Sequence, residues 1–526
     1  MTVRVLTPPS ESSATSEAVH RSAVHLILLM VVAAYFLAWP LWRAQYLIEI
    51  WPTEGWNAYL QDAAAAGLPI YPPPGSLVGN NYPPLSFYAI GFIGRMLGTD
   101  NLFVGRAISI VALLALAIEI FLAVRILTGS RWGGAIGGAW CLAIMARNST
   151  KYIGTNDPQL AGLALMGAGL VWFLARLRDN RSPDPALMLM VLAGFWKHNI
   201  AAIPIASMLW LLINQGRGAF RPIVFSAVAA AAGLAVCMLV FGSAFLPNLL
   251  ANRQYAWSNV VGNIGHLQWP ALAFAIWAGW ALDDRGSAAR FTALHIAAGL
   301  CLCILQWFGH GVSTNAEFDL IFALGIGVGV TWAGIETGWF AKRIGVNRAR
   351  DVMIAALLLR LIVSDRQETA LLILSSEFRS SIDATQANVL SEAARVTAMP
   401  GDVACVVKIE CRLAGKPFVV DEFKMEELVT TGKATTGEVE QMLADRHITP
   451  FTGTVPLGAN PDISISRWWN RRRPTFAGAA RKAEEARSAA FMAICEIGKA
   501  LHRGQPTDGL WAPAIDATQR WKALAG

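Results

Sequence analysis

The chain has 526 residues, of which 55% are hydrophobic and 15% are charged, and its mean hydropathy is +0.44. Soluble globular domains contain roughly 25% charged residues, so the composition excludes an ordinary soluble protein and indicates a polytopic α-helical membrane protein. The formal net charge of +7 does not indicate a nucleic-acid partner, because the basic residues cluster in short loops between apolar runs, where membrane topology accounts for them.

The apolar runs predict a transmembrane domain over residues 23–364, preceded by a cytoplasmic leader at residues 1–22. The leader contains Glu11 and Glu17, and the first apolar run is long enough to cross about 30 Å of hydrocarbon, so we expect an uncleaved anchor. Placing the basic loops in the cytoplasm gives about eleven spans. They are expected near 23–45, 104–124, 132–148, 159–175, 186–198, 200–214, 223–245, 269–282, 291–308, 317–336 and 352–364.

The first outer loop, residues 46–103, is the most informative segment of the chain. It is rich in Glu, Trp, Tyr and Pro, and it is much longer than a simple connection. We expect two helices in it, at 54–66 and 83–98, that lie flat in the outer interface. If residues 83–98 crossed the membrane, every later loop would be inverted and the basic clusters would face outward.

Two carboxylates of the outer loops are candidate catalytic groups. Glu54 precedes Gly55 and an aromatic stretch, where partial burial would suit it to accept a proton from an acceptor hydroxyl. The alternative for Glu54 is a cap on the following helix. Asp157 is followed by Pro158, so it is either a second site carboxylate or the start of the next helix.

Lys197 and His198 interrupt an apolar stretch at the outer end of a predicted span. A basic group there can bind a lipid phosphate while the lipid chain lies against the helices. The alternative is that Lys197 only extends to the interface. A divalent cation bridging Glu54 and Asp157 would fit a phosphate-bearing donor, but two carboxylates so distant in sequence do not define a metal site, so the metal ligands stay unassigned.

Residues 365–526 have soluble composition and form the predicted C-terminal domain of mixed α and β structure. Strands are expected at 403–409 and 417–420, and helices at 382–397, 436–445 and 476–502. If this domain is extracytoplasmic, Cys405 and Cys411 can form a disulfide, and Cys495 stays free.

A series of motifs resembles the first outer loop of the GT-C membrane glycosyltransferases, the superfamily of aminoarabinose transferases and protein O-mannosyltransferases. The motifs are Glu54–Gly55–Trp56–Asn57–Ala58–Tyr59, Gly67–Leu68–Pro69–Ile70–Tyr71 and Tyr82–Pro83–Pro84–Leu85, and the resemblance continues through Arg106, Asp157–Pro158, Lys197–His198–Asn199 and Ser313–Thr314–Asn315. The resemblance implies Glu54 as general base or acceptor-orienting acid, Asp157 as a second acid and Lys197 as partner of a polyprenyl phosphate. The further candidates for substrate binding are Asn57, Tyr59, Tyr82, His198 and Asn315.

The implied activity is transfer of a sugar from a polyprenyl-phosphate donor to an acceptor at the outer face of the inner (plasma) membrane, with inversion. The acceptor is a glycan, a lipid or a protein, and no cofactor other than a divalent cation is considered. A phosphate leaving group makes a nucleotide-binding loop unnecessary, and the glycines at 325–329 lie inside a predicted span, where close helix packing explains them. The alternatives are a secondary transporter with outward-facing carboxylates, and a scaffold whose tail binds an anionic surface through the basic and aromatic residues 467–473.

Overall fold

The computed structural model describes residues 16–73, 75–251, 253–363, 366–451 and 453–454. Contacts divide the chain into two compact units. The first comprises residues 1–372 and 379–459, and the second comprises residues 373–378 and 460–526. The first unit therefore contains both the helical bundle and most of the described C-terminal region. The domain boundary at residue 364, expected from composition, stays a prediction.

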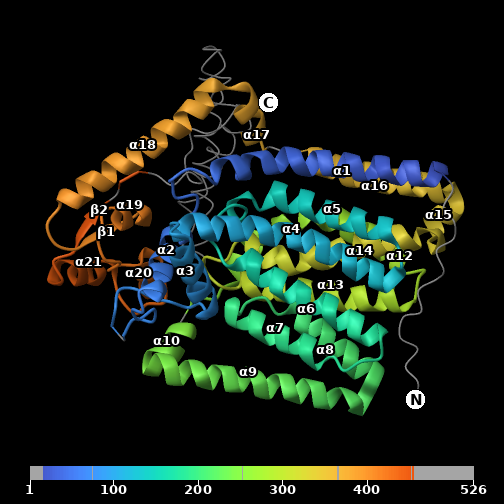
Figure 1. Ribbon diagram of the computed structural model, residues 1–526, viewed down its shortest axis with the longest axis horizontal. Coiled ribbons are helices and arrows are strands. Elements are labelled where there is room, and N and C mark those ends of the chain that lie inside the picture. The colour runs from blue at the N-terminus through green and yellow to red at the C-terminus, as the bar shows by residue number, and fades with distance from the viewer. Residues whose placement is uncertain (1–15, 74, 252, 364–365, 452, 455–526) are drawn as a thin grey trace, which may run out of the picture. The chain divides into compact units, whose positions relative to one another are not determined.

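The described part of the chain is mainly helical, and each predicted span falls on a helix (Figure 1). These helices are α1 (Ser16–Arg43), α4 (Asn101–Thr128), α5 (Arg131–Asn148), α6 (Gln159–Arg178), α7 (Asp184–Trp196), α8 (Ala202–Gln215), α9 (Phe220–Phe241), α12 (Ala271–Ala281), α13 (Ser287–Trp307), α14 (Phe318–Gly334) and α16 (Val346–Ile362). Within the described residues, six helical segments are long and apolar enough to cross a membrane, whereas α7 and α12 are shorter. The polytopic α-helical class is confirmed, and the number of crossings stays a prediction.

Helices α5 and α14 pack closely at the centre of the bundle. A Cβ added at Gly137 would lie 2.4 Å from the Gly325 carbonyl oxygen, and one added at Gly133 would lie 2.5 Å from that of Gly329. Larger side chains at these positions would push the two helices apart. The glycines of 325–329 therefore serve helix packing, as expected from their position within a span.

The segments predicted to face outward lie at one end of the bundle, on the left in Figure 1. Helices α2 (Thr53–Ala65) and α3 (Leu85–Leu97) match the two helices expected in the first outer loop. Helix α3 exposes an apolar row of side chains, Tyr88, Phe92, Met96 and Leu97, as a helix lying in a membrane interface requires.

Shorter elements complete the connections between these helices. They are η1 (Thr150–Tyr152), η2 (Gly216–Ala219), η3 (Gly242–Ala244), α10 (Phe245–Leu249), α11 (Trp257–Asn263), η4 (Ile264–Gln268), η5 (Thr314–Glu317), η6 (Ile335–Thr337) and α15 (Trp339–Ile344).

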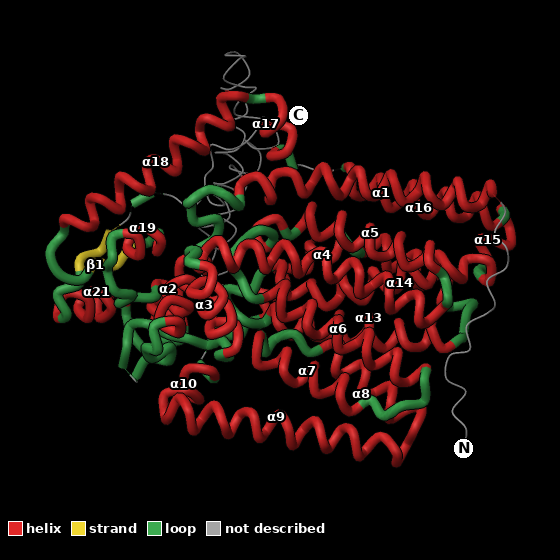
Figure 2. Tube along the Cα trace, in the orientation of Figure 1, coloured by secondary structure: helices red, strands yellow, loops and turns green. Residues whose placement is uncertain are grey.

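The described C-terminal region combines helices with one small sheet (Figure 2). Its elements are α17 (Glu368–Leu374), α18 (Ser376–Ala398), β1 (Val403–Cys405), α19 (Lys408–Leu413), α20 (Glu422–Thr430), α21 (Thr436–Asp445) and β2 (Thr449–Phe451). The two strands are parallel, and Val403 pairs with Thr449. The helices expected at 382–397 and 436–445 are present, and Cys405 is bonded to Cys411 as considered from the sequence.

The strand predictions for this region were partly wrong. The expected strand at 403–409 ends at Cys405, because α19 begins three residues later. Residues 417–420 are not a strand. Their apolar side chains instead pack on the first outer loop, where Phe418 stacks on Tyr59 and Val420 packs against Leu77. The helix expected at 476–502, the basic residues 467–473 and Cys495 lie outside the described residues.

Candidate active site

The polar face of α2 holds the turn that precedes Asp157. Glu54, Asn57 and Gln61 lie at helical positions i, i+3 and i+7, so they share one face. Asn57 Nδ2 donates to the Asn156 carbonyl oxygen at 2.8 Å, and the amides of Gln61 and Asn156 exchange two hydrogen bonds of 2.9 and 2.8 Å. The position of Asp157 is therefore set by side chains about a hundred residues earlier in the chain.

Glu54 is fully buried and paired with Arg106. Its two carboxylate oxygens accept from Arg106 Nε and Nη2, each at 2.8 Å, and also from the backbone amides of Ile50 at 2.7 Å and Asn156 at 2.8 Å. Two carboxylate oxygens provide about four acceptor sites, so these bonds use the whole carboxylate. In this geometry Glu54 has no free position to accept an acceptor proton, and it makes no cap on α2.

Arg106 connects Glu54 to the end of the first helix. Its Nη1 donates to the carbonyl oxygens of Ala44 at 3.1 Å and Tyr46 at 2.5 Å, and its Nη2 donates to that of Ile48 at 2.6 Å. The ion pair thus fixes the chain between α1 and α2 as well as the 155–157 turn. The sequence placed Arg106 among the motifs, but no local signal indicated that it would be the partner of Glu54.

Asp157 and Lys197 are both buried, and their opposite charges act on each other. Asp157 is 7% exposed, and its Oδ1 accepts from the Gln159 amide at 2.8 Å, so it also stabilises the start of α6 as considered from the sequence. Burial raises the pKa of Asp157, and the Lys197 charge opposes this effect. Burial lowers the pKa of Lys197 to about 7, and the Asp157 charge opposes it.

Lys197 is positioned by aromatic and helical contacts. Its Nζ lies 3.0 Å from the ring centroid of Tyr82, a cation–π contact. A Cβ added at Gly162 of α6 would lie 2.8 Å from the Lys197 Cβ, and the Trp196 indole donates to the Pro158 carbonyl oxygen at 3.1 Å. The end of α7 is therefore held directly against the start of α6, close to Asp157.

Arg253 adds a second positive charge to this group. Its charge contributes to lowering the pKa of Lys197, and its Nε lies 3.4 Å from Glu427 Oε1. Burial, followed by the charges of Lys197 and Arg253, lowers the pKa of His198 to about 4, so this imidazole is neutral near pH 7. Arg253 falls in the outer loop between the spans expected at 223–245 and 269–282, but it was not among the predicted site residues.

An apolar cavity of about 430 Å³ adjoins His198. It lies between α6, α7, α8 and α9, with part of its wall from the first outer loop. Its lining residues are Pro83, Met166, Leu187, Met190, Val191, Gly194, Phe195, His198, Ile200, Ala201, Pro204, Met208, Ala230, Ala231, Leu234, Phe245 and Leu249. An apolar cavity of this volume, lined at one position by His198, is suited to the apolar chain of a lipid.

Two predicted substrate-binding residues contact other parts of the protein. The Tyr59 hydroxyl donates to the Lys416 carbonyl oxygen at 3.0 Å, on the side of α2 that faces the C-terminal region. Asn315 Oδ1 accepts from the Ser313 amide at 3.2 Å, which makes a local turn. Among the described residues, no hydrogen bond or ring contact joins Tyr59 or Asn315 to Asp157 or Lys197.

The bridging cation considered from the sequence finds no set of ligands in the described part of the chain. No group of three or more His, Cys, Asp or Glu side chains is arranged there to hold a metal ion. Glu54, one of its two suggested ligands, is already occupied by Arg106 and two backbone amides.

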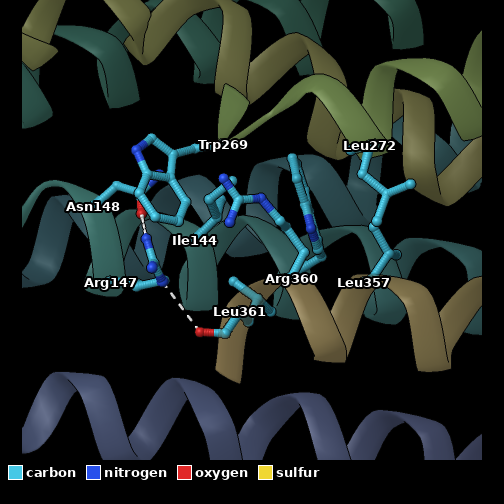
Figure 3. A pocket seen from close by; sticks show the side chains of 10 residues that line it. Ile144, Arg147, Asn148, Trp269, Leu272, Leu357, Arg360 and Leu361 are labelled. Atoms are coloured by element: carbon cyan, nitrogen blue, oxygen red, sulfur yellow. Dashed lines mark hydrogen bonds between the residues drawn. The ribbon is translucent and has the colours of Figure 1, made fainter. Parts of the chain in front are cut away.

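A second, much smaller pocket lies beside Trp269 (Figure 3). The guanidinium carbons of Arg147 and Arg360 lie 3.6 and 3.8 Å from the Trp269 ring centroid. Arg147 donates to the carbonyl oxygens of Leu361 at 3.1 Å and Val363 at 2.9 Å. The pocket has a volume of about 10 Å³, enough for one water molecule. These residues fasten the end of α16 to α5 and leave no room for a substrate.

The arrangement of the chain is similar to that of ArnT. The crystal structure of ArnT from Cupriavidus metallidurans bound to undecaprenyl phosphate aligns with 13% identity and a TM-score of 0.49, over 83% of this chain and 90% of that chain. The apo structure of the same protein aligns with 14% identity and a TM-score of 0.49, over 84% of this chain and 90% of that chain. No family model and no curated protein matches the sequence.

Proposed function

We propose that this protein is a membrane glycosyltransferase that moves a sugar from a polyprenyl-phosphate donor to an acceptor at the outer membrane face. One observation supports this most strongly: a buried lysine, Lys197, directly precedes His198, which lines an apolar cavity of about 430 Å³. A buried ammonium group is costly unless it is paired, and Lys197 has Asp157 and the Tyr82 ring near it. A phosphate on a lipid occupying the cavity would complete its pairing.

In the proposed reaction, an acceptor hydroxyl attacks the anomeric carbon of the donor sugar while Asp157 accepts the hydroxyl proton. The bond between the anomeric carbon and the phosphate oxygen breaks, and the electron pair leaves with the polyprenyl phosphate. Attack opposite the leaving group inverts the anomeric centre. Lys197 and Arg253 stabilise the negative charge that develops on the leaving phosphate.

Glu54 has a different role in this proposal from the one expected from the sequence. Its carboxylate is used by Arg106 and by the Asn156 amide, so it positions the turn that carries Asp157. Asn57 and Gln61 support the same turn from the next positions of α2. Asp157 is the remaining carboxylate beside Lys197 and the better candidate for the base.

The proposed location of the site is the outer face of the inner (plasma) membrane, with the C-terminal region extracytoplasmic. The Cys405–Cys411 disulfide supports this orientation, because disulfides persist mainly in oxidising compartments. The charges of the loops support the same orientation of the chain in the membrane, because the clusters rich in Lys and Arg lie in the loops assigned to the cytoplasm.

The test uses purified full-length protein and a panel of polyprenyl-phosphate sugars, and it follows release of polyprenyl phosphate. We expect turnover with at least one donor and acceptor pair, and loss of about a hundredfold or more in Asp157→Asn. Asp445→Asn, at an exposed position of α21, is the matched control and should retain full turnover. Unchanged turnover in Asp157→Asn would remove Asp157 from the base role, and absence of release with every donor would reject the activity.

A further inference from the structure

Helix α20 of the C-terminal region covers two outer loops of the bundle. These loops pair with each other: the His310 amide donates to the Gln254 carbonyl oxygen at 2.8 Å, and the Ala256 amide donates to that of Phe308 at 2.9 Å. Both loops lie on the side of the bundle that carries Arg253. Helix α20 therefore packs on two loops that are hydrogen-bonded to each other.

Phe423 is the central contact of this cover. Its ring stacks on His310, with 6.2 Å between ring centroids and 8° between ring planes. Gly311 lies directly below it with φ of +73°, and a Cβ there would be 2.4 Å from the Phe423 ring. Arg253 also faces this ring, with 5.5 Å between its guanidinium carbon and the centroid. Position 311 therefore requires glycine, both for its positive φ and for the close approach of the Phe423 ring.

Two glutamates of α20 form ion pairs with these loops, and one of them is nearly buried whereas the other is exposed. Glu427 pairs with Arg253 at 3.4 Å, and its side chain is 12% exposed. Glu426 pairs with His310 at 3.1 Å, and its side chain is 56% exposed. Only the Glu427 pair includes a cation that also acts on Lys197.

We infer that Glu427 is a positioning residue that competes with the donor phosphate for Arg253. This inference rests on the proposed function, since it requires an anionic lipid head beside Lys197. The Arg253–Glu427 pair consists of one hydrogen bond, and its length of 3.4 Å exceeds the 2.7–2.9 Å usual for charged pairs. The two-bond contact that a guanidinium makes with phosphate can therefore replace it.

The exchange has a structural consequence for the cover. When Arg253 turns to the phosphate, α20 loses its Glu427 contact and keeps the contacts of Phe423 and Glu426 with His310. Losing the pair with the Glu427 carboxylate charge costs part of the free energy that Arg253 gains from the phosphate. Removing this charge should therefore strengthen phosphate binding, whereas removing the neighbouring charge of Glu426 should not.

The experiment measures binding of farnesyl phosphate, a short polyprenyl monophosphate, to purified full-length protein by calorimetry. We expect Glu427→Gln to bind it about threefold more tightly than the wild type, the effect of removing a partly exposed charge. Glu426→Gln, one position away on the same helix, is the matched control and should bind like the wild type. In an Arg253→Gln background, which binds more weakly, the Glu427→Gln change should have no further effect.

The outcomes separate this inference from the proposed function. If folded wild-type protein does not bind farnesyl phosphate, the polyprenyl-phosphate donor is rejected. If the wild type binds and Glu427→Gln binds equally or more weakly, only the competition is overturned. A gain that persists without Arg253, or that Glu426→Gln reproduces, would also overturn it. Arg253→Lys replaces Arg253→Gln as the background if the latter does not fold, and the Glu427→Gln gain should then be retained.

Discussion

Glu54 and Arg106 lie 52 positions apart in the sequence and form a two-bond ion pair that is almost completely sealed from solvent. Around this pair, three separate segments meet: the end of α1, the start of α2 and the turn before Asp157. A buried pair of this kind adds little stability compared with apolar residues, but removal of one partner leaves an unpaired buried charge. The pair therefore links the stability of the protein to the geometry of its site.

The first prediction concerns this ion pair. Glu54→Gln leaves Arg106 buried without a counter-charge, so it should lower the free energy of unfolding by about 3–5 kcal/mol. Arg106→Gln should have a similar cost for the converse reason. Thermal unfolding of the purified variants checks both. The measurement separates a positioning role from a catalytic one. If Glu54 acted only as a base in the reaction, its substitution would lower activity and leave the free energy of unfolding unchanged.

The second prediction concerns the pH dependence of phosphate binding. Burial lowers the pKa of Lys197 to about 7, so its positive charge is lost as pH rises through this value. The second pKa of a phosphate monoester is about 6, so above pH 7 the ligand charge is nearly constant. Farnesyl phosphate affinity should then fall with rising pH, approaching about tenfold per pH unit.

Lys197→Arg is the control for this effect, since the guanidinium stays protonated. Its binding should be nearly independent of pH between 7 and about 9. The neighbouring charged groups are Asp157, whose pKa is raised by burial, and Arg253. Equal pH profiles for the wild type and Lys197→Arg would show that Lys197 does not hold the phosphate.

The third prediction concerns Glu49, which is fully buried below α19. Its Oε2 accepts from the Ile409 amide at 3.1 Å, and burial raises its pKa to about 8 despite the opposing charge of Lys408. Between about pH 4.5 and 8 the folded protein retains a proton that the unfolded chain has released, so stability falls as pH rises through this range. Glu49→Gln should remove this decline.

The measurement is the melting temperature of the wild type and Glu49→Gln across this range. At pH 8 the variant should be the more stable by about 1 kcal/mol or more, because one pKa unit corresponds to about 1.4 kcal/mol. At pH 5 the two should be nearly equal. A variant that is less stable at both values would mean that Glu49 is charged and paired in the folded state.

The sequence predicted those parts of the fold that depend on local composition. Long apolar runs placed the spanning helices, and the two helices of the first outer loop were expected at 54–66 and 83–98. The expectation that Glu54, Asp157 and Lys197 act in one site stays a prediction, although the charges of Asp157 and Lys197 each shift the pKa of the other. Membrane topology made this expectation possible, because it brings all outer loops to one end.

The parts that could not be predicted depend on contacts between distant residues. The apolar run 417–420 has the pattern of a strand, yet it packs on Tyr59 and Leu77, and β1 pairs instead with 449–451. Likewise, several arginines follow the first outer loop, and nothing in the local sequence indicates which would neutralise Glu54. Only the packing of α4 against α2 decides that it is Arg106 and that Glu54 is consequently not free.

The last prediction tests the apolar cavity. Ala230 of α9 lines it, whereas Leu239 of the same helix is 85% exposed and does not. A phenyl ring at position 230 would occupy space that the lipid chain needs. Displacing two buried methylene groups costs about 1.6 kcal/mol at about 0.8 kcal/mol each, so Ala230→Phe should weaken farnesyl phosphate binding at least about tenfold. Leu239→Phe, with the same ring facing outward, should bind like the wild type. Unchanged affinity in a folded Ala230→Phe protein would place the lipid chain elsewhere and would separate Lys197 from the cavity beside it.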